Sequence, residues 1–196
     1  MNRILLIDNY DSFVYNIFHL VKRVTDRRVD IVLNDRIPFD AIANYSHIIL
    51  SPGPGLPEDA GDLLKAIDYF KTSHSILGIC LGHQAIACNF GATLYNLRHP
   101  LHGHKSVISI IEKSDPLLGN IVDKAGRYPE IRAGLYHSWA VSPDSVPKEL
   151  IVGSVNEEGI IMSLFHKEFK LFGLQFHPES VISVYGEEII SNWLKL

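Results

Sequence analysis

Short apolar runs alternate with amphipathic segments through about the first 90 residues, and this alternation constrains the fold more than any other feature. The apolar runs cover residues 3–7, 29–33, 47–50 and 75–77, and they are typical of strands buried on both faces of a sheet. Strands that alternate with helices form parallel sheets with helices on both sides. The sequence therefore predicts an α/β fold with a mostly parallel, twisted sheet.

The segments between these strands predict helices, because their apolar residues recur at helical spacing. Asp11 or Ser12 is expected to cap the first helix, whose apolar stripe includes Ile17 and Leu20. Further helices are expected at residues 38–45, 63–70 and 85–90, and a last one at 187–194.

The second half of the chain has a different pattern, with strands and little helix between them. Strands are expected at residues 92–95, 107–111, 150–155, 160–165 and 171–176. Strands joined without crossover helices favour antiparallel pairing, so we expect an antiparallel extension of the sheet. We find no linker or internal repeat, and we expect residues 1–196 to form a single domain.

Composition narrows the function classes. The net charge is −4 and the basic residues are interspersed with acidic ones, which argues against binding to nucleic acid. No apolar run approaches the length of a membrane span, and the first residues do not form a secretory signal. Cys80 and Cys88 lie eight residues apart on a turn and the helix after it, so we expect two reduced thiols and a cytoplasmic protein.

Cys80 lies at the turn between a predicted strand and a predicted helix, with Gly78 two residues before it and Gly82 two residues after. This is the spacing of a nucleophile elbow, with cysteine in the place of serine. A strained turn crowds the positions two residues away, which favours glycine there. The start of the following helix favours the reactive thiolate.

His177 and Glu179 supply a base and an orienting group within three residues, again directly after a predicted strand. Alone, the His-Pro-Glu sequence would be an ordinary surface turn. Because the carboxyl ends of parallel strands meet at one edge of a sheet, we expect these residues to lie near Cys80 and form a Cys–His–Glu triad. The Leu81 backbone N–H and the Gly53-Pro54-Gly55 loop are the predicted oxyanion donors.

Five short motifs occur in this chain in an order that is typical of a known enzyme family. They are Asp8-Asn9-Tyr10-Asp11-Ser12-Phe13, Ser51-Pro52-Gly53-Pro54-Gly55, Gly78-Ile79-Cys80-Leu81-Gly82-His83-Gln84, Tyr136-His137-Ser138 and Phe176-His177-Pro178-Glu179-Ser180. Together they resemble a class I glutamine amidotransferase, specifically the small subunit of anthranilate synthase or aminodeoxychorismate synthase. The resemblance spans essentially the whole chain and implies a flavodoxin-like three-layer sandwich.

The resemblance also implies roles for individual residues. Cys80 would attack the side-chain amide of L-glutamine to give a glutamyl thioester and ammonia, His177 would carry the proton, and Glu179 would orient His177. The implied substrate-binding residues are Gly53, Pro54, Gly55, Leu81, Gln84, Ser138 and Trp139.

No cofactor or metal is implied, and the partner would be a large chorismate-binding synthase subunit. We expect that subunit to dock on the loops at residues 8–13 and 51–61.

Two departures from the family pattern stand near the site. Trp139 occupies a position where leucine is common, and His102-Gly103-His104-Lys105 replaces a shorter His-Gly-Lys sequence. A metal site at His99, His102 and His104 is disfavoured because no thiol or carboxylate lies at ligand spacing.

Two other functions remain open at this point. One is a free-standing Cys–His–Glu hydrolase of γ-glutamyl compounds, and the other is a non-catalytic docking subunit with this fold.

Overall fold

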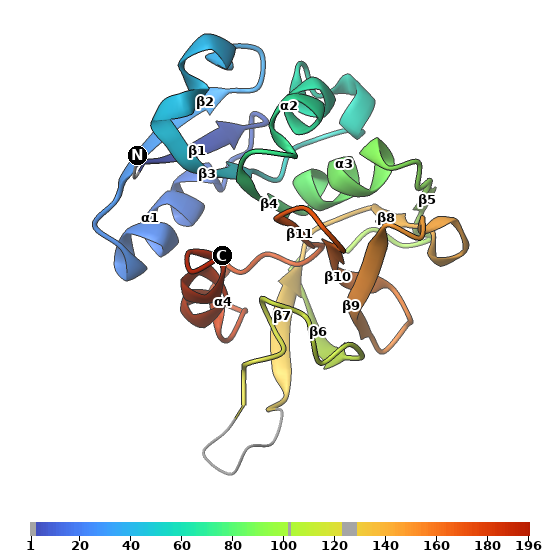
Figure 1. Ribbon diagram of the computed structural model, residues 1–196. Coiled ribbons are helices and arrows are strands. Elements are labelled where there is room, and N and C mark those ends of the chain that lie inside the picture. The colour runs from blue at the N-terminus through green and yellow to red at the C-terminus, as the bar shows by residue number, and fades with distance from the viewer. Residues whose placement is uncertain (1–2, 102, 123–128) are drawn as a thin grey trace.

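A computed structural model describes residues 3–101, 103–122 and 129–196 (Figure 1). The strands are β1 (Arg3–Asp8), β2 (Arg28–Leu33), β3 (Tyr45–Leu50), β4 (Ser75–Ile79), β5 (Leu94–Asn96), β6 (His104–Ile110), β7 (Ile131–Leu135), β8 (Trp139–Val141), β9 (Leu150–Asn156), β10 (Ile161–His166) and β11 (Leu171–Leu174). The α-helices are α1 (Val14–Val24), α2 (Leu63–Phe70), α3 (Leu81–Asn89) and α4 (Gly186–Trp193), and the 3-10 helices are η1 (Phe39–Asn44), η2 (Pro57–Asp59) and η3 (Pro143–Ser145).

Nine strands form one sheet in the order β2-β1-β3-β4-β11-β10-β9-β6-β7. The pairs from β2 to β11 are parallel, and the pairs from β11 to β7 are antiparallel. The parallel part has the 2-1-3-4-5 strand order of flavodoxin-like folds, with β11 in the fifth place. The predicted fold class, including the antiparallel extension, is confirmed.

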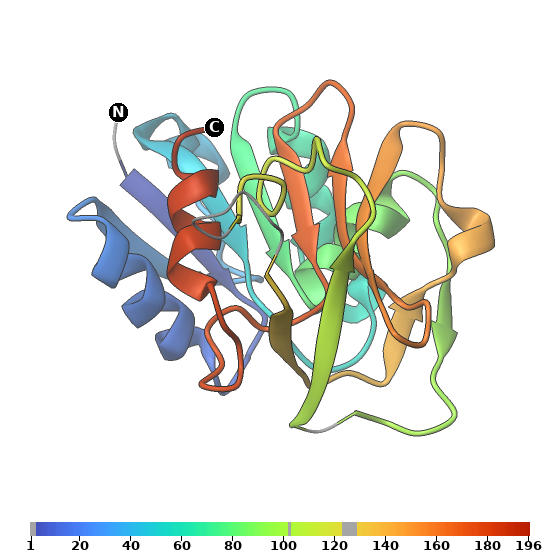
Figure 2. The same cartoon turned by 90° about the horizontal axis from the view of Figure 1, so that it is seen from below.

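Helices cover both faces of the parallel strands. In Figures 1 and 2, α1 and α4 lie together on one face, while α2 and α3 lie on the other. Side chains of β1 divide between the two resulting cores: Ile4 and Leu6 pack on the α1/α4 side, and Leu5 and Ile7 pack on the α2/α3 side. All four are fully buried, which explains why β1 is apolar at every one of these positions instead of alternating.

The start of the first helix differs from the prediction. Helix α1 begins at Val14 after Phe13, with no side-chain cap, so neither Asp11 nor Ser12 caps it. The chain turns before the helix instead, because the Asp8 carboxylate accepts a hydrogen bond from the Asp11 backbone N–H at 2.9 Å. This turn was not visible from the helical spacing alone.

Strands β7 and β8 were not expected. Strand β7 contains an arginine and a glycine, and it is stabilised by pairing with β6. Strand β8 has three residues and pairs with β5 in a separate two-stranded sheet. The segment at 38–45 is a 3-10 helix, η1, and is shorter than expected. Both strands depend on partners distant in sequence, which local patterns do not report.

Within the described residues, no helix has the length and apolar character needed to cross a membrane.

Candidate active site

Cys80 occupies the turn between β4 and α3 in a strained backbone conformation, with φ of 52° and ψ of −101°. A positive φ is unfavourable for a residue with a side chain and persists only where the surroundings enforce it. The Cys80 backbone N–H donates to the Leu174 carbonyl oxygen at 2.7 Å, and its carbonyl accepts from the Gln84 N–H at 3.0 Å. The turn is thus fixed by β11 on one side and by the first turn of α3 on the other.

The glycines on either side of Cys80 are required by close backbone contacts. A Cβ atom at Gly78 would lie 2.3 Å from the Gly82 carbonyl oxygen, and a Cβ at Gly82 would lie 2.4 Å from the Leu50 carbonyl oxygen. Both contacts are far inside van der Waals distance and involve main-chain atoms. The elbow therefore packs directly against the end of β3 as well as against itself.

His177 and Glu179 lie in the loop after β11, where His177 Nδ1 and Glu179 Oε1 are 2.6 Å apart. Only 3% of His177 and 9% of Glu179 is exposed. The loop is attached to β7, because the His177 backbone N–H donates to the Gly134 carbonyl oxygen at 3.1 Å. The Ser183 hydroxyl donates to the His177 carbonyl oxygen. An unpredicted strand therefore fixes the position of a predicted site residue.

The surroundings of His177 favour its protonated form. Burial by itself lowers the pKa of His177, but hydrogen bonds to Cys80 and Glu179, together with their charges, outweigh it and raise the pKa well above 6.5. Because Nδ1 contacts Glu179, Nε2 is the ring nitrogen left free to interact with Cys80. A protonated imidazole beside a cysteine is the pairing that activates cysteine nucleophiles in general.

A cavity of about 220 Å³ opens at Cys80. Its lining residues are Gly53, Pro54, Gly55, Cys80, Leu81, Gln84, Tyr136, His137, Ser138 and Trp139. Every residue that the sequence assigned to substrate binding lies on this lining. Tyr136 and His137 were not assigned to it, although both belong to a motif that the sequence analysis quoted.

Gln84 and Gln175 form a buried hydrogen-bonded chain beside Cys80. The Gln84 side-chain amide donates to the Trp139 carbonyl oxygen at 2.7 Å and to Gln175 Oε1 at 3.1 Å. Gln175 Nε2 lies 3.6 Å from Cys80 Sγ. Sequence reasoning gave Gln175 no role, although it stands two residues before His177.

The loop after β1 holds the Gly53-Pro54-Gly55 loop in place through contacts of Asn9. Asn9 is buried, its backbone N–H donates to Ser51 Oγ at 2.8 Å, and its side-chain amide donates to the Ser51 carbonyl oxygen at 2.8 Å. A Cβ atom at Gly53 would lie 2.6 Å from both the Cβ and the carbonyl oxygen of Asn9. Glycine at 53 therefore lets the loop approach Asn9 and, on its other side, Leu81.

Two further histidines near the site are held neutral. His83 is fully buried, and burial lowers its pKa to about 3. Burial also lowers the pKa of His137 to about 4, and its Nδ1 contacts the Trp139 carbonyl oxygen at 2.9 Å. His83 packs inside the fold beside Gly173, and His137 supports the backbone at 139.

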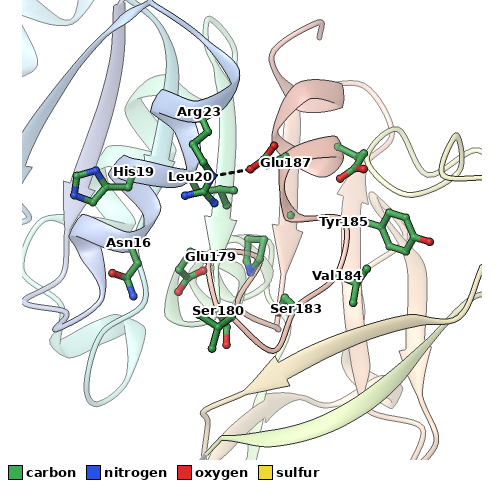
Figure 3. Close-up of a pocket in the computed structure, with 14 residues that line it drawn as sticks. Asn16, His19, Leu20, Arg23, Glu179, Ser180, Ser183, Val184, Tyr185 and Glu187 are labelled. Atoms are coloured by element: carbon green, nitrogen blue, oxygen red, sulfur yellow. Dashed lines mark hydrogen bonds and ion pairs between the residues drawn. The ribbon is translucent and has the colours of Figure 1, made fainter.

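A larger hollow of about 640 Å³ lies on the outer side of Glu179, between α1 and the loop leading into α4 (Figure 3). Asn16, His19 and Ser180 are among its lining residues. The ion pair between Arg23 and Glu187, 2.6 Å from Nε to Oε1, connects the two helices beside it.

Among the residues that the structure describes, no three His, Cys, Asp or Glu side chains are grouped to hold a metal ion. Of the histidines considered as a metal site, His102 lies outside the described residues.

Comparison with known proteins agrees with this geometry. The family model described as "Glutamine amidotransferase class-I" matches residues 5–196. Anthranilate synthase component 2 of Saccharolobus solfataricus is 40% identical, covering 99% of this chain and 98% of that protein. Aminodeoxychorismate/anthranilate synthase component 2 of Bacillus subtilis is 36% identical, covering 98% of this chain and 95% of that protein.

The fold is similar to a solved structure from Thermoplasma acidophilum, a protein provisionally assigned as one of the subunits of GMP synthase. The two share 26% identity with a TM-score of 0.84, covering 100% of this chain and 93% of the other.

Proposed function

This chain belongs to the class I glutamine amidotransferase family, and from that premise we propose that it is the glutaminase subunit of a chorismate-aminating synthase. Its reaction would be the hydrolysis of L-glutamine to glutamate and ammonia, with the ammonia passed to a large synthase subunit. The observation that carries this proposal is the cavity at Cys80, because it joins a strained nucleophile elbow to all the expected substrate-binding residues.

The first half of the reaction uses the pair of Cys80 and His177. The Cys80 thiolate attacks the side-chain amide carbon of glutamine and forms a C–S bond, while the carbonyl oxygen becomes an oxyanion. The backbone N–H groups of Gly53 and Leu81 would bind that oxyanion. The His177 imidazolium then gives its proton to the departing nitrogen, the C–N bond breaks, and ammonia leaves a glutamyl thioester on Cys80.

The second half reverses these roles. Neutral His177 takes a proton from a water molecule, which attacks the thioester carbon. The C–S bond breaks, glutamate leaves, and Cys80 and His177 return to their starting charges. Glu179, 2.6 Å from His177 Nδ1, keeps the ring oriented and stabilises its positive form through both halves.

Gln84, Ser138 and Trp139 would hold the substrate. Both amide hydrogens of Gln84 are used by the Trp139 carbonyl and by Gln175, so its side-chain oxygen is the atom left to accept a hydrogen bond from glutamine. Ser138 and Trp139 would bind the amino-acid end through main-chain groups. On this reading the Trp139 side chain is tolerated in place of leucine.

A large chorismate-binding subunit is the proposed partner, since relatives named as component 2 of anthranilate and aminodeoxychorismate synthases match nearly the whole chain. Ammonia is protonated in water, so a closely docked acceptor would protect it. Tyr10, Phe13 and Val181 support docking at the active-site edge, because they are 57%, 44% and 102% exposed.

The proposed chemistry uses only side chains and backbone groups, so we assign it no cofactor. We place it in the cytoplasm, where Cys80 and Cys88 would stay reduced.

Glutamate release from glutamine tests the proposal. The protein would be assayed alone, with the large subunit of an anthranilate synthase, and with the large subunit of an aminodeoxychorismate synthase, and Cys80→Ala would provide the blank. We expect weak activity alone and an increase of at least about tenfold with a cognate large subunit, equivalent to about 1.4 kcal/mol.

Activation by only one of the large subunits identifies the pathway, and activation by both identifies a shared component. High glutaminase activity that neither large subunit changes would contradict the proposal and favour a free-standing Cys–His–Glu hydrolase. If the complex with a large subunit still aminates chorismate from glutamine when Cys80→Ala is introduced, the chain would be a non-catalytic docking subunit.

A further inference from the structure

We propose that Gln175 is a fourth catalytic residue, whose side-chain amide donates a hydrogen bond to Cys80 Sγ and stabilises the thiolate. This role for Gln175 depends on the proposed function only because it takes Cys80 as the nucleophile. Gln175 is fully buried at the end of β11, and its Nε2 lies 3.6 Å from the sulfur. A buried amide has no water to bond with, so its donors must find partners within the protein.

The orientation of the Gln175 amide follows from a backbone carbonyl. Amide nitrogen and oxygen are distinguished by their hydrogen-bond partners, and the Trp139 carbonyl oxygen can only accept. It lies 2.7 Å from the Gln84 amide, which must therefore turn its nitrogen toward Trp139. That same nitrogen lies 3.1 Å from the Gln175 side chain, so Gln175 must present its oxygen to Gln84. The Gln175 nitrogen is left to face Cys80.

This hydrogen bond acts differently on the two forms of the thiol. A neutral sulfur is a weak acceptor, whereas a bond to a charged acceptor is roughly twice as strong as a neutral one. The donor therefore favours the thiolate over the thiol, in addition to the attraction of the protonated His177. The same hydrogen bond would also hold the Cys80 sulfur on the side of the cavity where the side-chain amides of Gln84 and Gln175 lie.

The same chain connects the nucleophile to the substrate-binding backbone. Trp139 lies on the cavity lining, and its carbonyl orients Gln84, which in turn orients Gln175. Gln84 thus acts as a positioning residue for Gln175 as well as facing the cavity. A shift of the backbone at 138–139 when glutamine binds would be transmitted to the sulfur through two amide groups.

Alkylation of Cys80 by iodoacetamide as a function of pH tests the role of Gln175 without any glutaminase assay. Gln175→Met keeps the length of the side chain and removes the donor. Gln175→Glu keeps an acceptor for Gln84 and replaces the N–H group facing sulfur with an oxygen. We expect the midpoint of the alkylation profile to rise by about 1 pH unit in Gln175→Met, and further in Gln175→Glu.

Several other groups influence the same profile. Glu179 contacts His177, the charge of Asp11 acts on His177 and Glu179, and His137 acts on His177. All three are unchanged in both variants. Cys88, whose pKa burial raises to about 11, is separated from Cys80 by locating the label with mass spectrometry.

Ser163→Ala is the matched control, because it removes a buried hydroxyl group from the adjacent strand β10 without touching the chain of amides. Its alkylation midpoint should equal that of the wild type. Folded Gln175 variants with an unchanged midpoint would overturn the proposal, whether or not the protein proves to be a glutaminase.

A measurement on the unmodified side chain covers the case in which both variants fail to fold. The chain contains only two glutamines, Gln84 and Gln175, so ¹⁵N-glutamine labelling gives two side-chain amide groups in an NMR spectrum. We expect the Gln175 amide signals to shift with the midpoint of Cys80 alkylation, and to stop titrating once Cys80 is alkylated. If the chemical shifts of the Gln175 side-chain amide do not change as Cys80 titrates, the proposal is also overturned.

Discussion

Burial and nearby charge act in opposite directions on the pKa of His177, whereas at His83 they act in the same direction. His83 and His177 are both almost completely buried, yet the pKa of one is lowered and that of the other is raised. Burial acts on both in the same direction. The difference comes from Cys80 and Glu179, which favour the positive charge on His177, whereas His83 packs against the backbone of Gly173.

Stability at acid pH should report the neutral state of His83. The unfolded chain binds a proton near pH 6.5, while folded His83 binds it only near the pKa of about 3. The unfolded state therefore carries more protons between these values, and the stability from neutral His83 is complete above pH 6.5 and is lost as the pH falls. His83→Leu should reduce the slope of unfolding free energy against pH by about 1.4 kcal/mol per unit.

Urea titrations between about pH 4.5 and 6 measure that slope, in the window set by these pKa values. The exposed His19, on α1, provides the control His19→Gln, because its ring is in water in both states. Equal slopes for His83→Leu and wild type would mean that His83 is not the buried neutral group described above.

At the scale of elements, a buried carboxylate joins the segment after β6 to the sheet. Asp115 Oδ1 accepts hydrogen bonds from the backbone N–H groups of Leu117 and Leu118, at 2.8 and 3.1 Å. Its Oδ2 accepts from Ser163 Oγ of β10 at 2.7 Å. A Cβ atom at Gly153 of β9 would lie 1.9 Å from that oxygen, so the strand leaves room for the carboxylate.

Removal of this carboxylate should destabilise the antiparallel half of the sheet. Asp115→Ala leaves the two buried N–H donors of Leu117 and Leu118 without their acceptor, whereas Ser163 Oγ keeps Ser154 Oγ as a partner at 2.8 Å. Each unsatisfied buried donor costs about 1–3 kcal/mol. We expect a loss of about 3 kcal/mol in unfolding free energy, measured by urea denaturation. Glu112→Ala is the control: Glu112 is only partly buried, its carboxylate accepts hydrogen bonds from Ser114, and its loss should cost less than about 1 kcal/mol. Similar losses in the two variants would contradict a special role for Asp115.

For the molecule as a whole, the parallel sheet brings four loops to one edge, and exposed aromatic residues border the site they form. Phe13 is 44% exposed, and its ring centroid lies 5.9 Å from that of Tyr136. Tyr136 in turn lies 5.0 Å from the ring of His177. A partner that covers Phe13 would therefore be connected to His177 through a single intervening ring, that of Tyr136.

Phe13→Ala should separate partner activation from the basal reaction. Phe13 lies outside the Cys80 cavity, so we expect basal glutamate release within about twofold of wild type. We expect activation by the large subunit to fall by about tenfold, because truncating a buried aromatic at an interface commonly costs more than 1 kcal/mol. Tyr69→Ala is the control, since this exposed aromatic of α2 lies on the opposite face of the sheet from α1. Full activation of Phe13→Ala would exclude this ring from the interface.

The sequence by itself determined the parallel half of the fold and the position of Cys80 at a strained turn between a strand and a helix. Buried strands, the helices between them and the Gly78-Ile79-Cys80-Leu81-Gly82 elbow depend on residues close together in the chain, and close-range constraints can be read from spacing. The resemblance to the family supplied the residues expected to bind substrate, and the structure places them on the lining of one cavity. The single-domain organisation stays a prediction.

Only the tertiary structure decided which distant side chains meet at Cys80. Gln84 and Gln175 are 91 positions apart in the chain, and they meet because β11 inserts beside β4 in the sheet. Strand β7 was missed for the same reason, although its Gly134 holds the backbone of His177. Contacts of this kind depend on which distant strands become neighbours in the sheet, and local patterns of residues do not encode that order.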